Sequence, residues 1–254
     1  MGRVTLGLLA AGFLAAVTAP AFAADEADIT GSWQRYGIGA NAANMAEGEK
    51  KFTPPPQPEP PLKPEYLKAW KEDQMRRKEM ADAGTPIATS WADCIGSGFP
   101  GMMAAAFPIE FLQSKGQVTI IEEAFTEVRR VYLGKKQVTL DDIEPGHYGH
   151  SVGYWKDGSL YVDTIGIKTH VQERNVPHSP EMEVKERFYM VSDDVLWDEI
   201  TVIDPQYLTK PWVWTYAYQK MPGYEMQEYI CEGNREYIDE EGVQHIRVGD
   251  PSDQ

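Results

Sequence analysis

A glutamate among apolar residues is the strongest candidate for chemistry in this sequence. Met182, Val184, Glu186, Phe188 and Met190 alternate along a stretch that predicts a strand, so they share one of its faces. A carboxylate on an inward, apolar face costs roughly several kcal/mol unless it is paired or protonated. Glu186 is therefore a candidate acid–base residue, because carboxyl groups with perturbed pKa values in cavities commonly serve in that role.

The alternative for Glu186 is a structural ion pair with an inward arginine. Arg129, Arg130 and Arg187 lie in predicted strands and could each provide the partner. We take Arg129 as a candidate catalytic residue, since an arginine can also stabilise a developing anion. Both interpretations of Glu186 remain open from the residues alone.

A second carboxylate lies in the next predicted strand, residues 196–203. Glu199 shares a face with Trp197, and Asp198 lies on the other face, so alternation does not indicate which of the two points inward. An inward carboxylate beside Glu186 could share a proton with it, which is a workable acid–base pair. We keep Glu199 as a candidate catalytic residue. The alternative is that one of the two carboxylates, either Glu186 or its neighbour on the next strand, faces solvent.

Histidines in turns could complete such a site. His150 precedes a predicted strand and His178 precedes the strand of Glu186, so both are candidate bases at the barrel rim. Asp163 could orient a histidine, or close its strand as a turn residue. The spacing of His147 and His150 could hold a metal, but it is less specific than HExxH. We therefore expect no metal and no other cofactor.

Aromatic side chains are abundant, with seven tryptophans and thirteen tyrosines. They could stack on a flat ligand, and their alternative role is to fill the core or, if they face outward, to form an interface. The candidates for ligand contact are Trp155, Tyr132, Trp197, Trp212, Trp214 and Tyr216. The last three share one strand face with Tyr218.

The remaining pattern predicts a mainly β protein with a single antiparallel, calycin- or lipocalin-like barrel. The main strands lie between residues 117 and 232, where Val, Ile, Tyr and Trp recur between turn signals. Residues 53–64 form a Pro-rich, extended segment, and residues 64–83 form one surface helix that ends before Gly84. Asp157-Gly158 predicts a hairpin turn.

The N-terminus predicts export. Residues 1–23 have a basic start, an apolar stretch and an A-x-A cleavage site, so residues 24–254 would form the mature single domain in the periplasm. Cys94 and Cys231 then predict a disulfide. The net charge of −15 argues against nucleic acid and anionic lipid as partners, and the apolar stretch is too short for stable membrane insertion.

The chain resembles a large group of exported, mostly uncharacterised bacterial proteins from sphingomonads and acidobacteria. The resemblance covers nearly the whole mature chain and implies a calycin-like barrel rather than a reaction. One turn departs from the group, at Lys156-Asp157-Gly158, and leaves Asp163 in place. The matching segments are residues 60–66, 94–102, 149–155, 160–164, 178–179, 186–187, 204–205, 211–212 and 231–234.

More weakly, the chain is similar to sphingomonad γ-formaldehyde lyases that act on lignin-derived aromatic dimers without a cofactor. Their catalytic residues do not map onto this sequence. Two functions follow as hypotheses. The first is a cofactor-independent lyase or isomerase for an aromatic or hydrophobic small molecule, which expects Glu186 beside His150 or His178 in an open cavity. The second is a non-catalytic periplasmic carrier, which expects every cavity carboxylate to be neutralised by arginine.

Overall fold

The fold is described from a computed structural model of the chain. The predicted signal peptide, residues 1–23, lies outside the described residues, as does most of the stretch that follows β1. The described residues are 26–37, 52–85, 87, 90–91, 94–104, 106–231, 236–238 and 244–246.

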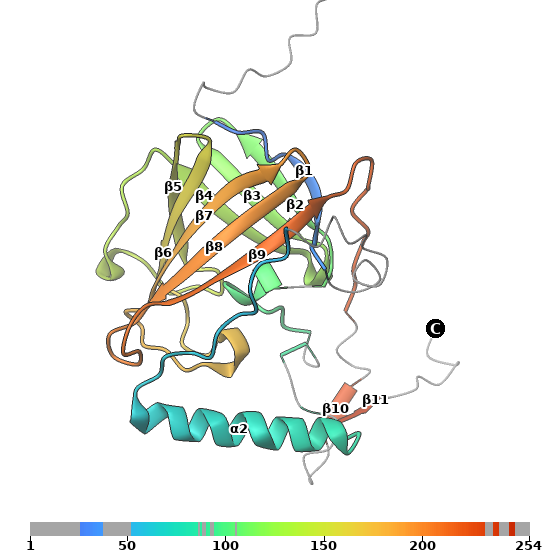
Figure 1. Cartoon of the computed structure of the whole chain (residues 1–254), viewed down its shortest axis with the longest axis vertical. Coiled ribbons are helices and arrows are strands. Elements are labelled where there is room, and N and C mark those ends of the chain that lie inside the picture. Colours follow the sequence, from blue (N-terminus) through green and yellow to red (C-terminus); the bar gives the residue numbers. More distant parts are fainter. Residues whose placement is uncertain are drawn as a thin grey trace, which may run out of the picture.

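Nine strands close into one barrel, which confirms the predicted mainly β fold (Figure 1). Strands such as β3 and β8 alternate more buried and less buried side chains, because one face packs into the core and the other meets solvent. The strands are β1 (Gly31–Arg35), β2 (Ile109–Ser114), β3 (Gln117–Glu122), β4 (Glu127–Leu133), β5 (His150–Lys156), β6 (Ser159–Ile165), β7 (Glu183–Ser192), β8 (Val195–Ile203) and β9 (Trp212–Lys220).

One strand pair differs from the prediction of an antiparallel barrel. β4 and β5 pair in parallel over three positions, from Val131↔Ser151 to Leu133↔Gly153, and all other neighbours are antiparallel. The segment between them passes over the outside of the barrel, where Gln137 donates to the carbonyls of His150 and Asp163, and so returns to the end at which β5 begins. The predicted turn at Asp157-Gly158 is confirmed, since both residues have positive φ, 50° and 71°.

The barrel interior is filled by side chains. Phe111 and Phe188 meet edge to face inside it, with ring centroids 5.6 Å apart. A segment that includes the short 3-10 helix η2 (Gly101–Ala104) enters from one end and buries Phe99, Met102 and Met103 almost completely. The lumen is therefore a packed core, as expected for a barrel of this size.

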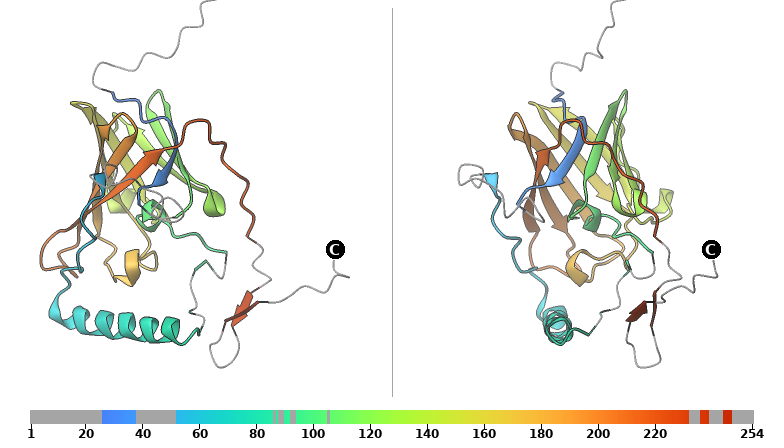
Figure 2. Two further views of the ribbon diagram at one scale, coloured as in Figure 1. Left: turned by 45° about the vertical axis from the view of Figure 1, so that its right-hand side comes forward. Right: turned by 90° about the vertical axis from the view of Figure 1, so that its right-hand side faces the viewer.

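The predicted helix is confirmed as α2 (Pro64–Asp82), which lies across one end of the barrel (Figures 1 and 2). The first half of α2 packs against the barrel. The ring of Tyr66 stacks on that of Tyr207 with centroids 4.3 Å apart, and the buried Trp70 donates a hydrogen bond from Nε1 to the Arg174 carbonyl at 3.1 Å. The end of the barrel that faces α2 is called the barrel base below.

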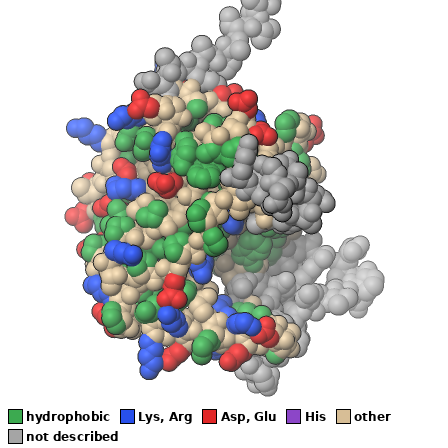
Figure 3. Space-filling model, in the orientation of Figure 1, with side chains coloured by type: hydrophobic (Ala, Val, Ile, Leu, Met, Phe, Trp, Pro, Cys, Tyr) green, Lys and Arg blue, Asp and Glu red, His purple; other side chains and the backbone are tan. Residues whose placement is uncertain are grey.

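Short turns and one small hairpin complete the described structure. The remaining 3-10 turns are η3 (Ala124–Thr126), η4 (Leu140–Asp142) and η5 (Glu173–Asn175). Near the C-terminus β10 (Glu236–Ile238) pairs with β11 (Gln244–Ile246), where the sequence had predicted only a solvated extension. Charges of both signs are interspersed with apolar side chains on the face seen in Figure 3.

The predicted disulfide is present between Cys94 and Cys231, 137 residues apart. A bond across so long a loop contributes on the order of 5 kcal/mol in the loop-entropy model. The disulfide connects the segment after β9 to the loop that leads to Phe99 and η2, which fill one end of the barrel. A disulfide fits an exported protein. Across the described part of the chain, no helix is long and apolar enough to span a membrane.

Candidate functional site

Glu186 forms a buried ion pair with Arg129 inside the barrel. Arg129 Nη1 donates to Glu186 Oε1 at 2.7 Å, and Nη2 donates to Oε2, so the pair is bidentate. Ser151 and Thr164 accept the other guanidinium protons at 3.1 and 3.0 Å. The ring of Phe99 lies 3.6 Å below the guanidinium carbon and closes the cluster to solvent. The geometry therefore matches the structural alternative for Glu186, with Arg129 as its partner.

The second inward carboxyl belongs to Asp198, and Glu199 is exposed on the outer face. Burial, followed by the negative charge of Glu186, raises the pKa of Asp198 well above its usual range, and Arg129 only partly opposes this. Neither Asp198 oxygen has a hydrogen-bond partner among the described residues. Asp198 is therefore protonated. Glu199 points to the opposite face of β8, so it does not share that proton.

The two candidate histidines lie apart from Glu186. His150 is on the outer face, where its Nδ1 bonds Gln137 Oε1 at 2.8 Å and its ring stacks on Tyr132. Burial and the charge of Lys135 lower the pKa of His150. His178 is buried at the barrel base, and both ring nitrogens face carbonyl oxygens, of Ser179 and Val171, at 2.9 Å. The structure brings neither imidazole to the ion pair.

The other candidates divide between the two faces of the barrel. Asp163 faces outward and pairs with Lys185 at 2.9 Å. Trp197 also faces outward and donates to the Phe52 carbonyl at 3.1 Å. Trp155 is half-buried inside the barrel. Trp212, Trp214 and Tyr216 share the inner face, as alternation predicted, but they are packed into the core rather than around a cavity large enough for a ligand.

An open cavity lies outside the lumen, between the barrel base and α2. We call it the base cleft, and its volume is about 670 Å³. Arg77 of α2 forms part of one side, and residues 170–175 of the β6–β7 connection form another. The rest of the wall consists of His147 and of Ser90, Trp91, Ile95, Gly96, Ser97, Gly101, Ala104 and Ala106. Ligand pockets commonly have volumes of about 300–1,000 Å³, so this cleft is large enough for a small molecule.

Glu173 is the buried carboxyl that borders the base cleft. Its Oε1 accepts from the Tyr216 hydroxyl at 3.0 Å and from Gln57 Nε2 at 3.4 Å. Burial raises the pKa of Glu173, and these hydrogen bonds only partly oppose the rise. Its Oε2 lies on the side of Gly101, which also lines the cleft. Glu173 can therefore offer a proton at the cleft wall.

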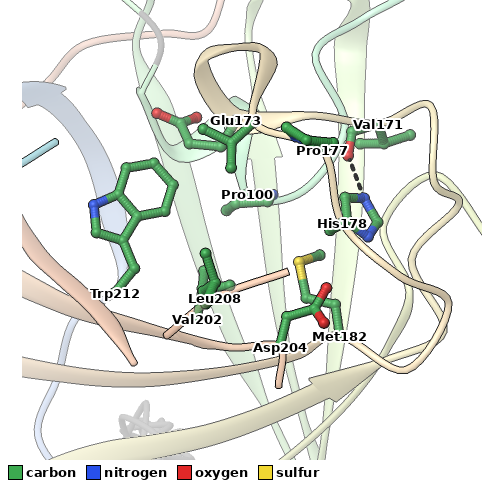
Figure 4. A pocket seen from close by; sticks show the side chains of 11 residues that line it. Pro100, Val171, Glu173, Pro177, His178, Met182, Val202, Asp204, Leu208 and Trp212 are labelled. Atoms are coloured by element: carbon green, nitrogen blue, oxygen red, sulfur yellow. Dashed lines mark hydrogen bonds between the residues drawn. The ribbon is translucent and has the colours of Figure 1, made fainter. Parts of the chain in front are cut away.

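A small inner cavity lies behind Glu173 and Val171 (Figure 4). Its walls are mostly apolar, with His178 hydrogen-bonded to Val171 on one side and Trp212 on the other. Its volume of about 20 Å³ leaves room for about one water molecule. The inner cavity is too small to hold the expected aromatic ligand.

A pair of glutamates supports the cleft wall from behind. Glu127 accepts from the backbone N–H groups of Ser97 and Gly98 at 2.9 and 2.6 Å. Its cross-strand neighbour Glu122 is fully buried, and burial together with the charge of Glu127 raises the pKa of Glu122 to about 10. A Cβ at Gly96 would lie only 2.4 Å from Glu127 Cδ, so a larger residue there would displace the Glu127 side chain. This pair shapes the wall without reaching the cleft.

Sequence reasoning did not single out Glu173. It lies in the η5 turn, where strand alternation gives no expectation, and Arg174 and Asn175 beside it adopt left-handed φ values of 51° and 57°. Such strained non-glycine residues gather at functional sites. Among the described residues, no three His, Cys, Asp or Glu side chains are grouped to hold a metal. The sequence matches no protein-family model and no curated protein.

Proposed function

We propose that this protein is an exported, periplasmic binding protein for an aromatic or hydrophobic small molecule, which it holds in the base cleft. The observation that carries the proposal is the pairing of a filled barrel lumen with an open cleft of about 670 Å³ at its base. Trp91, Ile95 and Val171 give the cleft an apolar part. In the lumen Glu186 is ion-paired and Asp198 is protonated, so neither of these two inward carboxyls is poised as a base.

Glu173 favours a second candidate, a cofactor-independent lyase or isomerase that acts on the same class of ligand. A buried carboxyl with a raised pKa at a cleft wall is a suitable general acid. The hydrogen bonds from Tyr216 and Gln57 to Oε1 fix its orientation. Catalysis in the cleft would therefore depend on Glu173 and not on Glu186.

One experiment separates the two functions. We expect the purified protein to bind members of a panel of aromatic monomers and dimers in calorimetric titrations, with no product detected by mass spectrometry. Glu173→Gln removes the acidic group and keeps the Oε1 acceptor, so it should leave binding within about twofold, because the amide oxygen still accepts the hydrogen bonds from Tyr216 and Gln57. Turnover that is lost in Glu173→Gln would establish the lyase or isomerase instead. Failure of the whole panel to bind would contradict both.

A further inference from the structure

The base cleft is basic in a chain whose net charge is −15. Arg77, Arg174, His147 and His170 line it, and Glu173 is the one carboxyl group among the described residues of its wall. The Glu173 carboxyl is buried and accepts hydrogen bonds from Tyr216 and Gln57, and burial raises its pKa. A cleft of this sign attracts an anion and repels a cation.

Arg174 reaches the cleft from the η5 turn with its charge unpaired. Its guanidinium makes one long hydrogen bond, from Nη1 to the Pro58 carbonyl at 3.4 Å, and no carboxylate of the described residues lies within ion-pair distance of it. Its backbone carbonyl is held by Trp70 and Gln74 of α2, at 3.1 and 3.3 Å. The turn is thus fixed while the cationic group remains available.

Arg77 approaches from α2 with part of its charge unpaired. Its Nε donates to Asp73 Oδ2 at 2.6 Å, and Arg76 donates to Asp73 Oδ1 at 2.6 Å, so two arginines share one carboxylate. Asp73 has one negative charge, so one of the two positive charges of Arg76 and Arg77 is not neutralised by it. Arg76 does not line the cleft, whereas Arg77 does. The two cleft arginines therefore come from separate elements, α2 and the η5 turn, and border the same cleft.

A flat apolar surface lies in the same cleft. The half-buried Trp91 is held in place by its Nε1, which donates to Ser97 Oγ at 2.8 Å, and by Phe125, whose ring centroid lies 5.1 Å away. Ile95, 48% exposed, lies beside it in the cleft wall. An aromatic ring of a ligand can pack against such a fixed indole.

We propose that the ligand of the base cleft is an aromatic carboxylate, whose charged group binds Arg77 and Arg174 and whose ring packs on Trp91. This rests on the proposed function, because it assigns a ligand class to the same cleft. Charge-assisted hydrogen bonds from two guanidinium groups favour a planar carboxylate over a neutral alcohol of the same size.

The test compares 2-naphthoate with 2-naphthylmethanol, which have the same ring system and differ in charge. By calorimetry in low salt, we expect the wild-type protein to bind the carboxylate about tenfold more tightly than the alcohol. Arg77→Gln/Arg174→Gln should remove that preference without weakening alcohol binding. Arg76→Gln is the matched control, since it also loses a bond to Asp73 but leaves the cleft lining unchanged.

The outcomes separate the inference from the proposed function. Equal binding of the two probes by the wild-type protein, or a preference that persists in the double variant, would overturn the carboxylate assignment. Either result leaves a binding protein for aromatic molecules intact. Binding of neither naphthyl probe, together with the failure of the wider panel, would remove the proposed function as well. Raising the salt concentration should weaken only the carboxylate, because screening acts on the charged pair.

Discussion

Replacing Arg129 with methionine is expected to lower the free energy of unfolding by about 3–5 kcal/mol, because Glu186 would lose its buried partner. The neighbouring Asp198 carboxyl, whose pKa is raised by burial and by the charge of Glu186, offers no positive charge to replace Arg129. Chemical denaturation of both proteins at pH 7 measures the effect.

The control for that change is the double variant Arg129→Met/Glu186→Met, which removes both charges together. A buried ion pair can often be replaced by apolar residues of similar volume at little cost, so the double variant should be more stable than Arg129→Met alone. A loss below about 1 kcal/mol in Arg129→Met, or a double variant no more stable than the single one, would show that the pair is not buried as described.

Replacing Glu122 with glutamine is expected to stabilise the protein by up to about 5 kcal/mol at pH 8. The pKa of Glu122 is raised to about 10 in the folded state, and in the unfolded chain it returns to its ordinary value of 4.5. The stabilising contribution is therefore complete below pH 4.5 and is lost as the pH rises toward 10. Each unit in that window costs about 1.4 kcal/mol, and glutamine does not titrate.

Denaturation measured from pH 5 to pH 9 tests this sign directly. The wild-type protein should lose stability with rising pH more steeply than Glu122→Gln, whose curve should be flatter. Glu228→Gln changes the net charge equally at an exposed position and should leave the slope unchanged. Parallel curves for the wild-type protein and Glu122→Gln would mean that Glu122 is ionised in the folded state.

Most of the barrel could be predicted because its strands alternate, and alternation follows directly from the geometry of a strand. β2 was missed because only Ile109 and Phe111 are buried in it, which is too short a pattern to recognise. The parallel β4–β5 pair was missed for a different reason. The sequence of the connecting segment, residues 134–149, does not indicate whether the next strand pairs with β4 as an antiparallel hairpin or whether the chain first returns to the other end of β4 and pairs in parallel.

The candidate site was predicted less well, because it depends on contacts between distant segments. Alternation placed Glu186 inside and allowed Arg129 as its partner, which the structure bears out as a contact. It could not choose between Asp198 and Glu199, since each face of β8 carries one carboxyl group. It also could not predict that Phe99 and its neighbours fill the lumen, which moves the available space to the base cleft.

The most direct test of a ligand site at the barrel base is a steric block of the cleft. Ala106 lines the cleft and is exposed, so Ala106→Trp should fill part of it without disturbing the core. Ala81→Trp, at an exposed position of α2 away from the lining, is the matched control. In calorimetric titrations with the tightest ligand of the panel, we expect Ala106→Trp to weaken binding at least about tenfold, a loss of about 1.4 kcal/mol, and Ala81→Trp to leave it unchanged. Unchanged binding in Ala106→Trp would contradict the account and return the search to another part of the molecule.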